Sequence, residues 1–348
     1  MAHHDPACST HHHGAHADET IDLTVADGVL PFHLAAAPAR GRVVRLGPLA
    51  QAILGRHNLP APVLGLGAEA LALVAGMAST LKFAGSFSLQ VKGDGPVSLL
   101  VADCTSEGGM RFTARMDEAW QANPTPLSDK ANELLGKGYL AFTIDQGPDT
   151  ERHQGIVELK GESLAAMAEG YFSSSEQHPC CIQLYQCHDE GHGWQGAGLF
   201  MERTPLEAHQ AAPGTTTPTD ALSSDELQAR AQDGWETAVT FARSLKQGEM
   251  FDDALSSSQI LHRLFGTLGV ADGQPRPLSF ACRCSRERLK LMLERFEAQE
   301  LDEMADNGVI TMDCGFCNTK YRFDRNTVTG TANKASQDAP NPVDKKTH

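Results

Sequence analysis

The sequence has too little positive charge for a protein that binds nucleic acid, with 29 lysines and arginines against 44 aspartates and glutamates. Binding to a phosphate backbone depends on neutralisation by basic side chains, so the acidic balance argues against a nucleic-acid partner. No uninterrupted apolar run of transmembrane length is expected, which predicts a soluble protein with no membrane partner. The first residues lack the apolar core of a signal peptide and the arginines of a transit peptide. We therefore expect a cytoplasmic protein.

The common motifs of catalytic sites are missing as well. The sequence contains no Walker A phosphate loop and no G-x-S-x-G nucleophile elbow. Residues 191–196 match G-x-G-x-x-G literally, but they follow a polar loop and precede no expected helix, so the context of a dinucleotide site is lacking. No two carboxylates are placed for acid–base catalysis. We expect that the protein is not an enzyme.

Nine cysteines are present, an odd and unevenly spaced set that does not resemble the disulfide framework of a secreted protein. Four of them form two close pairs near the C-terminus, Cys282-x-Cys284 and Cys314-x-x-Cys317. Two pairs of thiols separated by about thirty residues have the spacing of a metal site, because each pair supplies two ligands from a tight turn. Thiolates in a tetrahedral set suit zinc. The sequence thus predicts one zinc ion held by these four cysteines.

Two roles for such a site stay open from the residues alone. It can hold a small domain together, as in a zinc-ribbon interaction protein, or it can sense oxidants, since each pair is close enough to form its own disulfide. Arg283, Arg286 and Arg288 place positive charge nearby, which favours the reactive thiolate. A third alternative is a thiol oxidoreductase that uses Cys314-x-x-Cys317. That activity requires a C-x-x-C at a helix N-terminus, whereas here the pair follows an expected strand.

Other potential ligands are weaker. The first twenty residues are rich in histidine and include Cys8, so they can bind metal loosely, but a disordered extension is the simpler interpretation. Five soft ligands lie close together further on, and adjacent cysteines do not easily bind one tetrahedral ion. We interpret them as a divergent loop with incidental thiols, with a second metal site as the alternative: Cys180, Cys181, Cys187, His188 and His192. Cys104 at a strand end fits a buried small residue.

The periodicity of the first two hundred residues mixes strands with helices. Apolar residues nearly all round predict a buried helix over 68–81, and Ser163 can cap a helix that extends to Phe172. Alternating patterns predict strands, several of them joined as hairpins, over 42–46, 87–91, 97–102, 110–114, 139–144, 154–159, 181–186 and 198–202. The fold class expected is α+β, with an antiparallel sheet.

A proline- and threonine-rich stretch, residues 211–219, marks a linker. Two helices with narrow apolar faces follow it, around Trp235 and Leu261, and we expect them to depend on neighbours for stability. Ser285 can cap a helix that places Leu289, Met292, Leu293 and Phe296 on one face, and 309–312 reads as a strand. The predicted units are a disordered extension (1–20), an α+β substrate domain (21–210), a metastable helical linker (211–277), a small zinc-binding domain (278–325) and a disordered tail (326–348).

Several segments of the chain resemble one family, the redox-regulated heat-shock chaperones known as heat-shock protein thirty-three. The switch segment carries the most specific part, Cys282-x-Cys284 followed by Ser-Arg-Glu-Arg and Cys314-Gly-Phe-Cys317 followed by Asn-x-Lys-Tyr-x-Phe. Segments similar to the substrate domain of the family are 68–73, 79–83, 93–96, 134–138, 144–147, 154–157 and 171–177. The resemblance covers residues 21 to 325. The histidine-rich start, the 180–192 loop and the tail depart from the family pattern and leave extra metal binding and additional disulfides open.

The resemblance implies a cytoplasmic, ATP-independent holdase of oxidative and heat stress that is switched by its metal. In the reduced state, one zinc per chain binds Cys282, Cys284, Cys314 and Cys317, and the chaperone is inactive. Oxidation would release the zinc and form the disulfides Cys282–Cys284 and Cys314–Cys317. The zinc domain then unfolds, the linker helices lose their support, and apolar surface binds unfolding client proteins. The family also implies a homodimer in the oxidised state.

Overall fold

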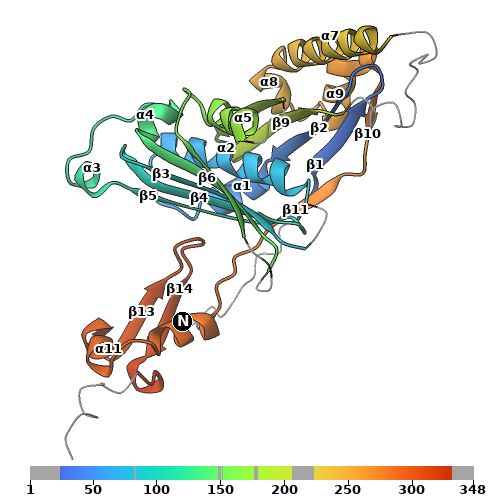
Figure 1. The fold of residues 1–348 in the computed structure, drawn as a ribbon. Helices are drawn as coiled ribbons and strands as arrows, with labels where there is room; N and C mark the ends of the chain where they lie inside the picture. The colour runs from blue at the N-terminus through green and yellow to red at the C-terminus, as the bar shows by residue number, and fades with distance from the viewer. Residues whose placement is uncertain are drawn as a thin grey trace, which may run out of the picture.

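A computed structural model of the chain describes residues 24–81, 84–147, 150, 152–175, 179–205 and 223–330. The expectations for the histidine-rich extension, for the 211–219 stretch and for the tail beyond residue 330 lie outside these residues. Within them, the chain forms one large curved sheet with helices on both faces, and a smaller lobe at the C-terminus (Figure 1). The α+β class with a small C-terminal lobe predicted from the sequence is confirmed.

The large sheet is almost entirely antiparallel. Its strands lie in the order β7-β6-β3-β4-β5-β11-β1-β2-β9-β8, and β10 pairs with the outer part of β1. The parallel pair is β5 with β11. The bounds are β1 Thr24–Leu34, β2 Ala39–Leu46, β3 Ser86–Gly93, β4 Val97–Thr105, β5 Gly109–Met116, β6 Gly138–Asp145, β7 His153–Glu158, β8 Cys180–Asp189, β9 Gly193–Arg203, β10 Val270–Asp272 and β11 Arg276–Phe280.

Helix α2 (Ala61–Ala78) lies in the concave face of this sheet and is buried on nearly all sides. It begins seven residues before the predicted start at residue 68, because Pro62 is tolerated in a first turn whose N–H groups have no partner in the helix anyway. It ends at Ala78 rather than at Leu81, where the Ser79 hydroxyl donates to Gly76 O at 2.7 Å. Contrary to expectation, α2 is long and apolar enough to span a membrane, but 78% of that window is buried inside the protein.

The remaining helices on the α2 side close the ends of the same core. They are α1 Pro48–Leu54, α3 Glu118–Ala122, α4 Ala131–Leu135 and α5 Leu164–Ser175. The cap predicted at Ser163 is present, because its hydroxyl accepts the N–H of Ala166 at 3.2 Å. The literal glycine motif belongs to the β8–β9 hairpin. Gly193 turns with φ of +69°, and a side chain at Gly196 would meet Ala68 O of α2 at 2.5 Å, so packing and turn geometry account for these glycines.

Three helices cover the opposite face of the sheet, over β1, β2, β8 and β9 (Figure 1): α7 Ser224–Arg243, α8 Gln247–Met250 and α9 Ser257–Phe265, followed by the 3-10 turn Gly266–Leu268. Trp235, Leu261 and Phe265 are buried against sheet residues such as Phe32, whose ring stacks on that of Phe265 at 5.4 Å. The predicted dependence of these helices on a neighbouring surface agrees with this packing. We call this surface of the sheet the linker face.

The chain returns to the large sheet after these helices, which the sequence did not lead us to expect. Two prolines in three residues, Pro275 and Pro277, are unusual for a strand, yet β11 forms here and lies between β1 and β5. Pro277 is tolerated because the pairing of β11 with β1 is irregular between Val25 and Val29, so no ladder hydrogen bond requires its missing N–H. Strand β1 itself was also missed.

The smaller lobe, residues 282–330, holds a three-stranded sheet and two short helices: α10 Arg286–Leu293, α11 Ala298–Met304, β12 Ala305–Asp306, β13 Val309–Asp313, β14 Lys320–Asp324 and the 3-10 turn Arg325–Thr327. We call it the metal lobe. Ser285 caps α10 as predicted, accepting the N–H of Arg288 at 3.2 Å. Leu293 is buried at 1% exposure, but Met292 of the same predicted face is 50% exposed.

Candidate metal centre

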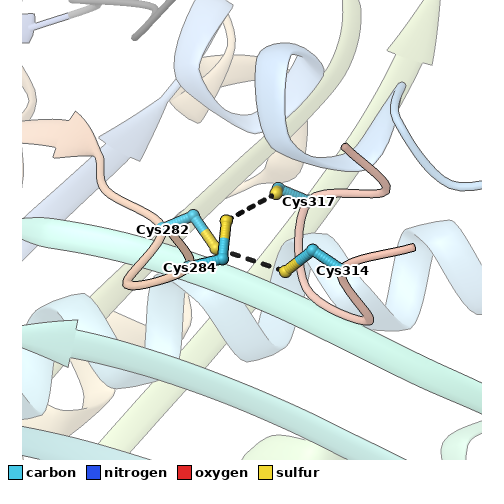
Figure 2. A group of neighbouring side chains, drawn as sticks. All are labelled: Cys282, Cys284, Cys314 and Cys317. Atoms are coloured by element: carbon cyan, nitrogen blue, oxygen red, sulfur yellow. Dashed lines mark hydrogen bonds between the residues drawn. The ribbon is translucent and has the colours of Figure 1, made fainter. Parts of the chain in front are cut away.

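The four cysteines of the two predicted pairs converge from separate segments, as Figure 2 shows. Cys282 and Cys284 lie in the chain that leaves the large sheet just after β11. The end of that strand is held by Ala281, whose N–H donates to Met110 O at 2.9 Å. The first pair of thiols is therefore anchored directly to the edge of β5.

The second pair lies in the turn between β13 and β14, residues 314–319, which we call the knuckle. Asn318 N–H donates to Cys314 O at 2.8 Å, and Cys314 N–H donates to Thr319 O at 3.0 Å. Asn318 adopts a left-handed conformation with φ of 53°, which asparagine tolerates better than most residues. These bonds fold the turn so that both Cys314 and Cys317 face the first pair.

The separations of the sulfur atoms fit one metal ion. All four Sγ atoms lie within 4.8 Å of one another, with 3.6 Å between Cys282 and Cys314 and 3.4 Å between Cys284 and Cys317. A tetrahedron with metal–sulfur bonds of about 2.3 Å has sulfur–sulfur edges of about 3.8 Å. These cysteines can thus hold a metal ion with small adjustments of their side chains.

The thiols already share protons unequally. A hydrogen bond from Cys282 lowers the pKa of Cys317 to about 4, while contact with Cys317 raises the pKa of Cys282. Burial raises the pKa of Cys284, although the Tyr321 hydroxyl, 3.2 Å from its Sγ, favours the thiolate. Contacts among the sulfur atoms thus favour the thiolate at Cys317, and a bound cation would favour ionisation of the other thiols.

Two of the three arginines expected to activate these thiols are engaged elsewhere. Arg286 donates to Arg322 O at 2.6 Å and stacks on the ring of Phe323, and Arg288 donates to Arg283 O at 2.7 Å. The contacts between the sulfur atoms, together with burial, set the thiol pKa values instead. For Arg286 and Arg288, the expectation of activation from sequence proximity is thus not supported by the geometry.

The knuckle also contacts the large sheet domain directly. Asn318 donates to Arg56 O at 2.7 Å, and the guanidinium of Arg111 lies 3.8 Å from the ring centroid of Phe316. Arg111 is held by Asp103, which is 3% exposed and accepts its Nε at 2.6 Å. In Figure 1 the loop between β13 and β14 points towards this part of the sheet. The metal lobe is thus docked through the turn that supplies two of its thiols.

His57 completes this contact from the end of α1. It is 9% exposed, and the ring of Phe112 meets it edge-on at 5.4 Å. Burial lowers the pKa of His57, so its imidazole is neutral at the interface. The sequence alone does not indicate Arg56, His57 and Arg111 as parts of this contact, because single residues far apart in the chain carry no spacing signal. Phe316 lies within the second cysteine motif, but its partner Arg111 is set by the fold.

The second group of soft ligands does not assemble. Cys180 and Cys181 lie on opposite faces of β8, Cys180 towards the α2 core and Cys181 under the linker helices. Burial raises the pKa of Cys180 to about 12 and that of Cys181 to about 11, so both are poor ligands and poor nucleophiles. His192 pairs with Asp189 and Asp253 instead. Among the described residues, the one cysteine–histidine–carboxylate group with metal-site geometry is the set at residues 282–317.

Cys104 is the buried small residue that the sequence predicted. It is 1% exposed on β4, and burial raises the pKa of its thiol to about 12. Its Sγ contacts Thr105 O at 3.4 Å. Cys104 therefore belongs to the core of the sheet.

Known proteins resemble the chain over most of its length. A family model described as Hsp33 protein matches residues 27–324. The 33 kDa chaperonin of Caulobacter vibrioides is 35% identical, covering 88% of this chain and 98% of that protein. The 33 kDa chaperonin of Shewanella frigidimarina is 33% identical, over 83% of this chain and 89% of that one.

A solved structure supports the fold. The crystal structure of the 33 kDa chaperonin of Thermotoga maritima superimposes with a TM-score of 0.68, covering 87% of this chain and 96% of that chain at 21% identity. The family match spans the large sheet, the helices of the linker face and the metal lobe, including both cysteine pairs. The chain therefore belongs to the Hsp33 family of chaperones.

Proposed function

We propose that this chaperone is a redox-regulated, ATP-independent holdase, in which Cys282, Cys284, Cys314 and Cys317 bind one zinc ion in the inactive, reduced state. The observation that carries the proposal is the convergence of four thiols within 4.8 Å at the contact between the metal lobe and the large sheet. Zinc is the metal that four thiolates in this arrangement favour. It would supply a tetrahedral crosslink and no redox chemistry of its own, which leaves oxidation to the sulfur atoms.

The size of the metal lobe supports a switch rather than a passive support. Its core contains eight buried residues, two of which are the ligands Cys314 and Cys317. So small a core does not suffice for independent folding, and metal binding in such lobes is folding free energy. An oxidant such as hydrogen peroxide would take two electrons from each pair of zinc-bound thiolates and become two hydroxide ions. The products would be the disulfides Cys282–Cys284 and Cys314–Cys317, which no longer bind zinc, so the zinc would be released and the lobe would unfold.

Strand β11 is the element that would carry this change to the linker helices. It ends at Phe280, two residues before Cys282, and it pairs with β5 through only Ser279 and Phe280. At its N-terminal end, β11 follows β10, which pairs with β1 and packs against α9. Unfolding of the metal lobe would fray β11, loosen β10 and expose the linker face.

The linker face would then be the surface that binds client proteins. Its buried residues are largely aliphatic and aromatic, and they lie on a sheet that keeps its own α2 core on the other side. Exposed apolar sheet surface of this kind binds unfolding chains without nucleotide. We further propose that the active form is a homodimer acting in the cytoplasm, with the unit boundaries given in the sequence analysis.

Oxidation monitored on a single sample tests this function. Reduced, zinc-loaded protein would be exposed to peroxide at mildly raised temperature, and zinc release would be followed beside light scattering of an aggregating client. We expect scattering to fall as zinc is released, in the absence of ATP. Equal suppression by the reduced protein at the same temperature would contradict the switch.

A disulfide exchange assay separates this function from the alternative of a thiol oxidoreductase. The geometry disfavours that alternative, because Cys314 and Cys317 lie between two antiparallel strands and not at a helix N-terminus. We expect no turnover of a model disulfide. A constitutive zinc-ribbon protein would hold its zinc through the same oxidation without any change in client aggregation.

A further inference from the structure

A cavity with an aromatic wall lies where the two ends of the curved sheet approach each other beyond α2. Its volume is about 630 Å³, within the range of small-molecule sites. One wall is aromatic, formed by Phe87, Phe142, Tyr171 and Phe172, whose neighbouring rings lie 4.9 to 5.6 Å apart. The cavity lies on the α2 side of the sheet, away from the linker face, so the proposed switch does not use it.

The opposite wall is charged. Arg40 and Arg42 of β2 lie there, and both donate to the same oxygen, Oε1 of Glu202, at 2.9 and 2.8 Å. Each guanidinium has five N–H donors, so one shared carboxylate oxygen leaves most of them available to a second acceptor. Burial lowers the pKa of Arg42, and Arg40 and Arg276 lower it further while Glu202 opposes them. Two guanidinium groups thus share one carboxylate at this wall.

The other acidic group near the cavity is engaged by the backbone of β8. Glu169 lies close to Cys180, but its carboxylate accepts the N–H of Ile182 at 2.7 Å. The Cys180 thiol lines the cavity without being reactive, because burial raises its pKa to about 12. Arg276 also donates to Ser79 O at 2.5 Å, which offsets the negative end of α2. The chemistry of the cavity is therefore an aromatic chamber with surplus guanidinium donors at one side.

We propose that this cavity binds an amphipathic carboxylate of the fatty-acid class, with its chain against the aromatic wall and its carboxylate at Arg40 and Arg42. Guanidinium groups match a carboxylate in geometry and charge, and the aromatic wall gives the chain an apolar environment. A neutral ligand of the same length would gain binding free energy only from its contact with the aromatic wall. The site is independent of the thiols, so reduced protein is competent to bind.

Calorimetric titration of the reduced, full-length protein with decanoate, below its micelle concentration, tests the site. Decan-1-ol is the uncharged ligand of equal chain length. We expect saturable binding of one decanoate per chain. Its affinity should be at least about tenfold higher than that of decan-1-ol, because hydrogen bonds between charged groups contribute enough free energy for such a ratio. Equal affinity for the two ligands, or no saturable binding of decanoate, would overturn the proposal.

Two substitutions with opposite expected effects locate the head group. Arg42→Met should weaken decanoate by about tenfold and leave decan-1-ol unchanged, whereas Glu202→Gln should tighten decanoate by removing the competing carboxylate. Thr80→Trp is a further variant, because Thr80 is an exposed residue at the rim and its change does not disturb the charged wall. It should block both ligands, and unchanged decanoate binding in this variant would place the ligand elsewhere and refute the site.

Discussion

The core around α2 and the metal lobe are built on different principles, although one continuous chain forms both. The α2 core buries a large set of apolar residues between the curved sheet and helices on its concave face, and its cysteine is inert. The metal lobe buries eight residues, and two of these are proposed zinc ligands. Apolar burial stabilises the first irrespective of redox state, whereas the second, under the proposed function, depends on metal–sulfur bonds that an oxidant would remove. The proposed switch needs both parts, because the stable part would keep its structure while the other unfolds.

Removal of the metal should produce the largest difference between the two regions. In Cys317→Ser we expect loss of zinc and unfolding of residues 282–330, since binding of a structural zinc by thiolates is worth ~10–16 kcal/mol. Amide exchange should then approach unprotected rates in the metal lobe and stay slow in α2. Cys187→Ser is the matched control, because Cys187 is a half-buried cysteine outside the set. Loss of protection in α2 as well would mean that the two regions fold as one unit.

Truncation of one buried leucine in each region should affect a different property of the protein in each case. Leu71 in α2 and Leu301 in α11 are both fully buried at 0% exposure, and Leu→Ala at such positions costs ~2–5 kcal/mol. Leu71→Ala should lower the free energy of unfolding of the large sheet and leave zinc affinity unchanged. Leu301→Ala should instead lower zinc affinity, because folding of the metal lobe is coupled to metal binding. Denaturant titration measures the first effect, and zinc competition with a chelator measures the second. Lower zinc affinity in Leu71→Ala, or unchanged zinc affinity in Leu301→Ala, would contradict the difference between the two regions.

The contact between the two regions has a smaller expected effect. Phe316→Ala removes the stacking on Arg111, and such a cation–π contact contributes ~0.5–2 kcal/mol. We expect faster amide exchange in the knuckle and zinc release several-fold faster under peroxide, with the stability of the large sheet unchanged. Phe316→Trp should restore the original rate, because indole is the better partner of a guanidinium. Equal release rates in the alanine variant and the parent would show that docking does not protect the thiols.

The smallest expected effect is an opposite response of the two regions to pH. Burial raises the pKa of Glu69 in α2 from 4.5 to about 7. Its contribution to stability is therefore complete below about pH 4.5 and is lost as the pH rises through 7. The metal lobe behaves in the opposite way, since protonation of the thiolates at low pH releases the metal.

Glu69→Gln tests this contribution. The side chain is only half-buried, so we expect the free energy of unfolding of the large sheet at pH 8 to rise by on the order of 1 kcal/mol. The difference from the parent should vanish near pH 4.5. Denaturant titration at the two pH values measures it, and a difference that does not depend on pH would show that ionisation of Glu69 is not the cause.

Most helices and strands were predicted from local sequence patterns. The structure confirms those whose pattern lies within a single segment. The alternation at Phe87, Leu89 and Val91 forms β3, and the narrow apolar face around Trp235 forms α7. Strand β11 was not predicted, because Pro275 just before it and Pro277 within it are unusual for a strand. The irregular pairing that tolerates Pro277 involves β1, some 250 residues earlier in the chain. Boundaries of α2 were displaced for a similar reason, since Pro62 looks like a stop and acts as a start.

The sequence by itself determined the candidate metal centre, because ligand type and spacing are local properties. Two thiols in each tight turn suffice to predict that Cys282, Cys284, Cys314 and Cys317 meet. Only the tertiary structure decided what surrounds that centre. It placed Phe316 on Arg111, turned Arg286 and Arg288 away from the thiols, and threaded β11 between β1 and β5. These contacts join residues that are distant in the chain, and their partners are set by the closure of the sheet, which no periodicity of a single segment records.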